Sequence, residues 1–177
     1  KETISNRGVG IVWTLLLLSS TLSLRKFYQD DFESGNLLIL HLNGFSFGFI
    51  AILKTLSHFF FVQVPFLISL PIAAILLNIA NDKLIYLFSS FAIGSLILSC
   101  LGSISSSMNL MNQKNFLLGS VIVMILSIPV IIFSVGIINF EENFNLLINI
   151  LFGILLIVFS INPWAGGLCI KLSLENS

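Results

Sequence analysis

The sequence has few charged residues and lacks the signatures of several enzyme classes. Only 9% of its 177 residues are charged, 56% are hydrophobic and the mean hydropathy is +1.06, which excludes an ordinary soluble domain. There is no Gly-Lys dipeptide, which excludes a P-loop ATPase, and there is no H-E-x-x-H zinc motif. The two cysteines, Cys100 and Cys169, lack the C-x-x-C spacing of a redox pair.

Five long apolar stretches fill most of the chain, at about residues 8–24, 46–78, 84–108, 116–139 and 146–170. A helix needs about 20 residues to cross a hydrocarbon layer about 30 Å thick, and each stretch is near or above that length. Only helices and closed barrels satisfy the backbone in lipid, and these runs do not alternate as barrel strands do. We therefore predict an all-α, polytopic membrane protein, a single transmembrane domain over residues 1–177 with five spans.

The basic residues predict an orientation. Arg25 and Lys26 follow the first stretch, Lys114 lies between the third and the fourth, and Lys171 follows the fifth. An excess of Lys and Arg marks the cytoplasmic or matrix side, so we expect the N-terminus outside and the C-terminus inside. Because the chain starts at Lys1 and the number of stretches is odd, we also expect an earlier span that this chain lacks.

Polar residues within the apolar stretches form two groups. Lys54 and His58 share one helical face near the predicted inner boundary, and ionisable side chains in a membrane are functional candidates, although Lys54 can also simply snorkel to the interface. In the third stretch serines recur every four residues, at Ser95, Ser99, Ser103 and Ser107. This small-residue face predicts a close helix–helix contact or, alternatively, the lining of a substrate path.

Prolines and one short motif raise further alternatives. Pro65, Pro71 and Pro129 should kink or interrupt their helices, either as packing adjustments or as hinges for alternating access. The run from Gly44 to Gly48 matches the G-x-S-x-G nucleophile motif, but no strand is predicted before it. We therefore interpret it as a flexible helix start rather than as the site of a hydrolase.

The hydrophilic segment at about residues 25–45 is the most informative part outside the spans. It places two bases after the first span, then Asp30, Asp31 and Glu33, and then Gly35, where the chain can turn. A short apolar run from Asn36 to Leu42 follows, and we predict a short helix lying against the inner membrane surface. Such an element suits docking onto a soluble partner, although an ordinary solvated loop has a similar charge pattern.

Separate anchor residues occur at the spacing of one known family. They are Gly10-Ile11-Val12-Trp13, Ser19-Ser20, Asp30-Asp31, Gly35, Lys54, His58, Pro65 and Pro71. With Asn162-Pro163-Trp164-Ala165 near the end, the chain resembles the cytochrome c maturation protein B family over nearly its whole length. Members of that family are permease-like subunits of an ABC-type complex in bacterial and some mitochondrial inner membranes.

The resemblance implies six helices of the type-2 ABC exporter architecture, the first of which is absent here. It implies a non-catalytic subunit that binds no cofactor directly, with ATP on a separate ABC ATPase subunit and haem handled by the complex. The other implied partners are a Trp-rich haem-handling membrane subunit, a small single-span subunit and a haem chaperone. The presence of only Trp13 and Trp164 agrees with haem handling on another chain. The implied location is the bacterial inner membrane or, alternatively, the mitochondrial inner membrane.

The resemblance also assigns roles to residues. Together with the charge pattern, it predicts an ATPase contact that comprises Asp30, Asp31, Glu33 and Gly35. The functional candidates within the membrane, chosen as ionisable residues and prolines in apolar stretches, are Lys54, His58, Pro65 and Pro71. The predicted function is to couple ATP hydrolysis to haem delivery or to release of the haem-loaded chaperone. Alternatives are a permease that exports a lipid or glycan and a purely structural membrane subunit. The chain departs from the family pattern after Gly35, since residues 36–39 contain no acid and Asn43-Gly44 replaces a proline-rich turn.

Overall fold

The computed structural model describes residues 2–23, 27–76, 84–111, 117–139 and 141–175, and these residues form helices and turns without any strand. The first part contains α1 (Glu2–Ser23) and two short helices, α2 (Gln29–Glu33) and α3 (Asn36–Leu42). The long helices that follow are α4 (Phe47–His58), α5 (Val64–Leu76), α6 (Leu84–Met111), α7 (Leu117–Asn139) and α8 (Phe144–Glu175). A π-helical turn, Phe59–Gln63, joins α4 to α5, and a 3-10 turn, Glu141–Asn143, precedes α8.

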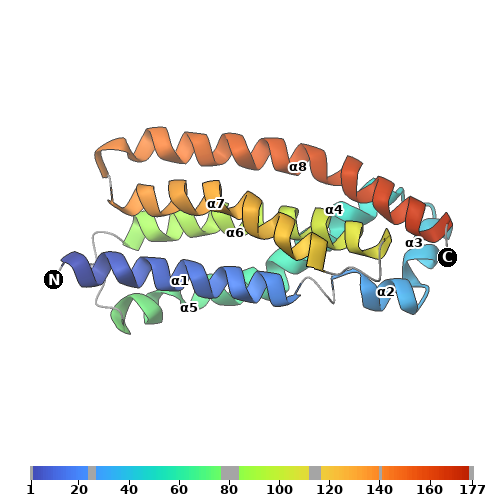
Figure 1. Ribbon diagram of the computed structural model, residues 1–177, viewed down its shortest axis with the longest axis horizontal. Coiled ribbons are helices and arrows are strands. Elements are labelled where there is room, and N and C mark those ends of the chain that lie inside the picture. The colour runs from blue at the N-terminus through green and yellow to red at the C-terminus, as the bar shows by residue number, and fades with distance from the viewer. Residues whose placement is uncertain (1, 24–26, 77–83, 112–116, 140, 176–177) are drawn as a thin grey trace.

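The long helices form an elongated bundle in which α1, the continuous segment of α4 and α5, α6, α7 and α8 run alternately in opposite directions (Figure 1). α6 lies at its centre and packs against α8, α7, α4, α1 and α5. The close approach of α1 to α6 depends on Gly94, because Trp13 fills the space where a Cβ would lie and stacks at a tilt on Phe91, 4.7 Å between ring centroids. The helices α2 and α3 and the C-terminal end of α8 lie together at one end, which we call the platform end (Figure 1).

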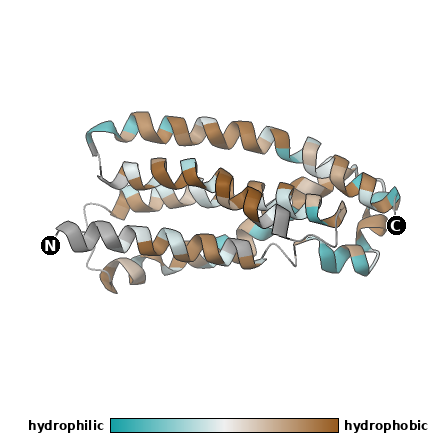
Figure 2. Cartoon of the chain, viewed as in Figure 1, coloured by the Kyte–Doolittle hydropathy of each residue, from teal (hydrophilic) through white to brown (hydrophobic). Residues whose placement is uncertain are grey.

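In the part of the chain that the structure describes, three helices are long and apolar enough to cross a membrane, namely Phe47–Leu76, Leu84–Met111 and Phe144–Glu175. Two further apolar helices, Gly10–Ser19 and Val121–Ile137, are shorter. Large apolar side chains are exposed along the outside of the bundle, and the hydrophilic residues gather on α2 and near the helix ends (Figure 2). The prediction of an all-helical membrane protein is therefore confirmed, and three spans are supported. The count of five, the sixth helix and the exporter architecture stay predictions.

Helix boundaries agree with the apolar stretches to within a few residues, apart from two extensions. α1 begins at Glu2 rather than near residue 8, and α8 continues to Glu175 rather than ending near residue 170. The basic residues Arg25, Lys26 and Lys114, used to predict the orientation, lie outside the described residues, so the orientation stays a prediction.

Of the three prolines predicted to kink or interrupt their helices, only Pro65 lies beside an interruption of the regular α-helix. The regular α-helix gives way to the π-helical turn directly before Pro65, and this wider turn accommodates a residue that has no N–H to donate. Pro71 and Pro129 lie inside continuous α-helices, so an interruption at these two positions is excluded. Prolines are tolerated in membrane helices because neighbouring groups and small backbone adjustments compensate for the lost hydrogen bond.

Candidate functional site

A small helical platform, formed by residues 27–45, covers one end of the bundle. Gly35 has φ +74°, a left-handed conformation that residues with a Cβ rarely adopt, and it reverses the chain between α2 and α3. Leu37 of α3 is fully buried and belongs to an apolar cluster with Ile50, Leu110 and Ile170. The short helix predicted at Asn36–Leu42 is thus present, and it is packed onto α4, α6 and α8 rather than lying free.

The acidic residues of the platform differ in their surroundings. Asp31 forms an ion pair with Lys54 of α4 and accepts a hydrogen bond from Asn36 Nδ2, 3.3 Å away. Asp30 is exposed, and so is Glu33, which accepts a hydrogen bond from Gln29 Nε2 at 2.8 Å. Of the acids predicted to contact a partner, Asp31 is therefore bound within the chain, whereas Asp30 and Glu33 face outward.

Two aromatic residues connect the platform to the centre of the bundle. The Tyr28 side chain is fully buried, and its hydroxyl shares a 2.8 Å hydrogen bond with Ser103 Oγ of α6. Burial raises the pKa of the Tyr28 phenol well above its ordinary value, so the hydroxyl keeps its proton at physiological pH. The Phe27 ring lies against His58 of α4 with ring centroids 4.8 Å apart. Neither aromatic residue was singled out from the sequence.

The four predicted serines of α6 form a polar seam that is buried throughout. Ser99 donates its proton to the Ser95 carbonyl at 3.1 Å, and its oxygen lies 3.1 Å from His58 Nδ1. A hydroxyl has one proton, so His58 Nδ1 must carry the hydrogen of the second bond. His58 Nε2 is then an acceptor, and it is buried without a hydrogen-bond partner among the described residues. The seam thus brings Ser103 to Tyr28, and Ser99 to His58.

The helix α8 approaches α4 very closely. Asn162 Nδ2 donates to Thr55 Oγ1 at 2.8 Å, and Thr55 in turn donates to the Ala51 carbonyl at 2.9 Å. A Cβ on Gly167 would lie 2.8 Å from the backbone nitrogen of Gly48, a separation that real Cβ atoms do not show. Lipid provides no hydrophobic driving force for helix association, so membrane helices associate through small residues of this kind. The sequence analysis identified the serines of α6 but missed this glycine contact.

The structure therefore brings together some of the predicted candidates and separates others. Lys54 and His58 lie on one face of α4 and both contact the platform, through Asp31 and Phe27 respectively. Pro65 and Pro71 are exposed and lie farther along the same helical segment, outside this cluster. Asn162, the missed polar residue on α8, carries a signal that sequence reasoning can use, because an amide within an apolar stretch needs a buried partner.

The nucleophile-like motif serves as a helix start, as interpreted. Ser46 is the N-cap of α4, and its Oγ accepts a hydrogen bond from Phe49 N at 3.3 Å. His41 stacks on Phe47 with ring centroids 3.9 Å apart, and its Nδ1 lies 3.1 Å from the Phe45 carbonyl oxygen. The Ser46 side chain therefore satisfies the backbone of α4, which is the role of a cap.

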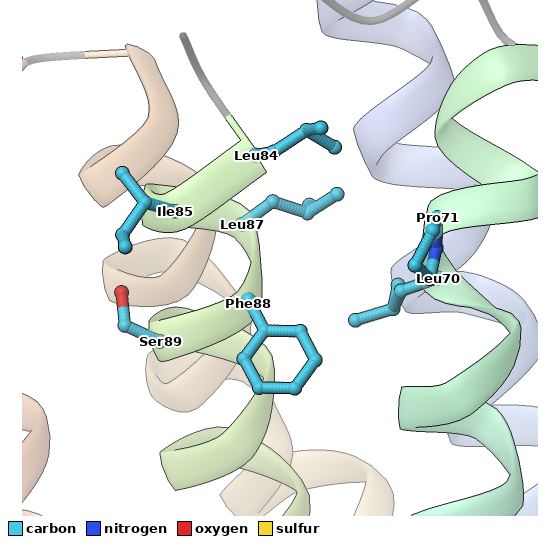
Figure 3. A pocket seen from close by; sticks show the side chains of 7 residues that line it. All are labelled: Leu70, Pro71, Leu84, Ile85, Leu87, Phe88 and Ser89. Atoms are coloured by element: carbon cyan, nitrogen blue, oxygen red, sulfur yellow. The ribbon is translucent and has the colours of Figure 1, made fainter. Parts of the chain in front are cut away.

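The structure also contains apolar grooves away from the platform. One cavity of about 460 Å³ lies between α5 and α6, where Leu70 points across the gap toward Phe88 and Pro71 lines the α5 side (Figure 3). A second, of about 320 Å³, lies between α1 and α7. The residues that line both cavities are mostly apolar, so the cavities are suited to hydrocarbon chains. Within the described residues, no group of three or more His, Cys, Asp or Glu side chains is placed to hold a metal ion.

These features define a helical membrane protein with a short helical platform fixed to one end and a buried polar seam at its centre. The family model for CcmB protein matches residues 1–173, and the chain belongs to this family, which confirms the resemblance seen in the sequence. It is 28% identical over 178 residues to heme exporter protein B of Haemophilus influenzae, covering 99% of this chain and 80% of that protein.

Other relatives carry the same name. The chain is 30% identical over 132 residues to heme exporter protein B of Paracoccus denitrificans, covering 75% of this chain and 61% of that protein. It is 24% identical over 177 residues to heme exporter protein B of Rhodobacter capsulatus, covering 98% of this chain and 81% of that protein. The similarity to relatives from several bacteria therefore extends over most of the chain.

Proposed function

We propose that the protein is the permease-like membrane subunit of an ABC-type haem exporter complex in cytochrome c biogenesis. In this role it catalyses no reaction itself and converts ATP-driven motion of a separate ATPase subunit into haem delivery or release of the haem-loaded chaperone. The names of the relatives support the haem-exporter part of the proposal. We further propose that the chain crosses a bacterial inner membrane five times, beside a Trp-rich haem-handling subunit and a small single-span subunit.

The observation that carries this proposal is the surface of the platform. Leu42, Ile39 and Leu38 are 76%, 54% and 46% exposed, and the exposed Asp30 and Glu33 belong to the adjacent helix. Apolar centres with charged rims are typical of protein interfaces, and exposed apolar patches at such a place mark interaction sites. The exposed charges of residues 27–45 are the acids Asp30 and Glu33, which favour a basic protein surface over anionic lipid. A soluble protein partner with a basic rim therefore fits this surface best.

Charge reversal on the platform tests the proposed docking. The full-length protein is purified from membranes of its own host, and an ATPase subunit that purifies with it is identified by mass spectrometry. Asp30→Lys combined with Glu33→Lys should weaken ATPase association about two- to thirtyfold, since exposed charge pairs contribute roughly 0.2–1 kcal/mol each. Asp31 is left intact in this variant because it holds the platform to Lys54.

The matched control is Glu142→Lys, which reverses an exposed acid at the end of the bundle opposite the platform. It should leave ATPase recovery unchanged. Absence of any ATPase subunit from the purified complex would contradict the proposal. Equal recovery with the double platform variant and with the control would remove the platform as the docking surface. A lipid or glycan exporter would retain its ATPase but purify without haem-handling partners.

A further inference from the structure

Besides the apolar packing of Leu37 and the stacking of His41 on Phe47, three specific side-chain contacts connect the platform to the long helices. Asp31 is paired with Lys54, and Phe27 lies on His58, which is one helical turn farther along α4. Tyr28 shares its hydrogen bond with Ser103 on the central helix α6. Phe27 and Tyr28 are neighbours in the platform, and they contact two different helices, α4 and α6 respectively.

The contact between Tyr28 and Ser103 differs from ordinary packing because it is polar, buried and directional. Tyr28, Ser99 and Ser103 are each fully buried, and His58 is 7% exposed. Ser99 and Ser103 are successive positions of the seam, so the contacts of His58 and Tyr28 lie one turn apart on the same face of α6. A hydrogen bond in such a dry environment is costly to leave unmade. Displacement of the platform must therefore move α6 with it or break the Tyr28 bond.

We propose that Tyr28 is the positioning residue through which movement of the platform is transmitted to α6. This inference rests on the proposed function, because it assumes a partner that moves the platform. The phenol hydroxyl fixes the position of Tyr28 relative to Ser103. The contact between Phe27 and His58 makes α4 move together with the platform. Tyr28 itself is buried away from the outer surface of the platform, so it acts after docking rather than in docking.

The test removes the hydroxyl without removing the ring. In the full-length protein expressed in its own host, Tyr28→Phe should leave the recovery of the ATPase subunit unchanged. The yield of haem-stained c-type cytochromes should fall about three- to tenfold, the effect expected from losing one hydrogen bond. Ser103→Ala should give the same loss, and the double variant should be no worse than either single variant, since both remove one bond. Ser103→Thr, which retains a hydroxyl, should restore most of the yield.

Tyr86→Phe is the matched control, because Tyr86 belongs to α6, the helix that Tyr28 contacts, but packs edge-on against Phe144, 5.0 Å between ring centroids. It should change neither readout. Unchanged cytochrome yield with Tyr28→Phe would overturn the inference. So would a parallel loss of ATPase recovery, or a loss of membrane-inserted protein as large as the fall in cytochrome yield, because Tyr28 would then act in docking or folding. Failure of the proposed function is distinguished by the charge-reversal variant of the platform, which would then retain both ATPase and cytochromes.

Discussion

Replacing Gly167 with alanine would place a methyl carbon 2.8 Å from the backbone nitrogen of Gly48 and 3.0 Å from its Cα. Both neighbouring atoms belong to the backbone of α4, so the contact can be relieved only by moving α4 and α8 apart. Overpacking of this kind costs about 1–3 kcal/mol. The substitution also gains about 0.5–1 kcal/mol, because alanine loses less conformational entropy than glycine within a helix.

Gly153→Ala separates these two effects. Gly153 lies on the same helix, and a Cβ there meets nothing within 4 Å, so only the favourable helix term applies. Because both variants share that term, their difference isolates the crowding of α4 against α8, at about 1–3 kcal/mol. Gly48→Ala should resemble Gly167→Ala, since its Cβ would lie 2.9 Å from the Pro163 carbonyl oxygen.

The assay is the free energy of unfolding of each purified variant in mixed detergent micelles. We expect Gly153→Ala to be as stable as the parent or more stable, and Gly167→Ala to be the less stable of the two. Equal stabilities of the Gly167 and Gly153 variants would show that α4 and α8 do not approach as closely as the structure describes. The reasoning about the small-residue contact between these helices would then be refuted.

Three further predictions concern packing, the platform and orientation. Ser103→Leu should lower the free energy of unfolding by about 1–3 kcal/mol because Ser103 is fully buried, whereas Ser160→Leu at an exposed position of α8 should leave it unchanged. Equal thermal stabilities of the two variants would show that Ser103 does not lie in a close helix contact. Lys54→Ala should destabilise by roughly 1 kcal/mol through loss of its partly buried ion pair, and Lys171→Ala, in a pair more than half exposed, should have almost no effect on thermal unfolding. Glu142→Cys, in a background without the native cysteines, should react with an impermeant reagent from the outer side, and labelling from the inner side alone would reverse the assigned orientation.

The sequence predicted the long helices well because hydropathy is a local signal. The apolar run after Gly35 also predicted α3 at its observed boundaries, since a turn glycine and a short apolar segment are adjacent in the chain. The contacts of the candidate site were not predictable in this way. Tyr28 and Ser103 are 75 residues apart, and no periodicity in either segment indicates that they meet. The serine repeat showed which face of α6 is small, but it did not show that the platform reaches it.

The prolines illustrate a second limit of the sequence. Pro65, Pro71 and Pro129 look alike as helix breakers, yet only the first follows a π-helical turn. The outcome depends on how neighbouring helices and the local backbone compensate for the lost hydrogen bond. Likewise, three acids in the segment 30–33 suggested a uniform docking charge. The structure instead pairs Asp31 with Lys54, whereas Asp30 and Glu33 are exposed.

Removing the protein from its own host tests directly whether it serves haem delivery in cytochrome c biogenesis. Haem-stained c-type cytochromes and the haem content of b-type cytochromes are measured in membranes of the deletion strain. We predict that c-type cytochromes disappear, that b-type cytochromes keep their haem, and that the full-length gene restores the loss. Normal amounts of haem-stained c-type cytochromes in the deletion strain would contradict the proposed function.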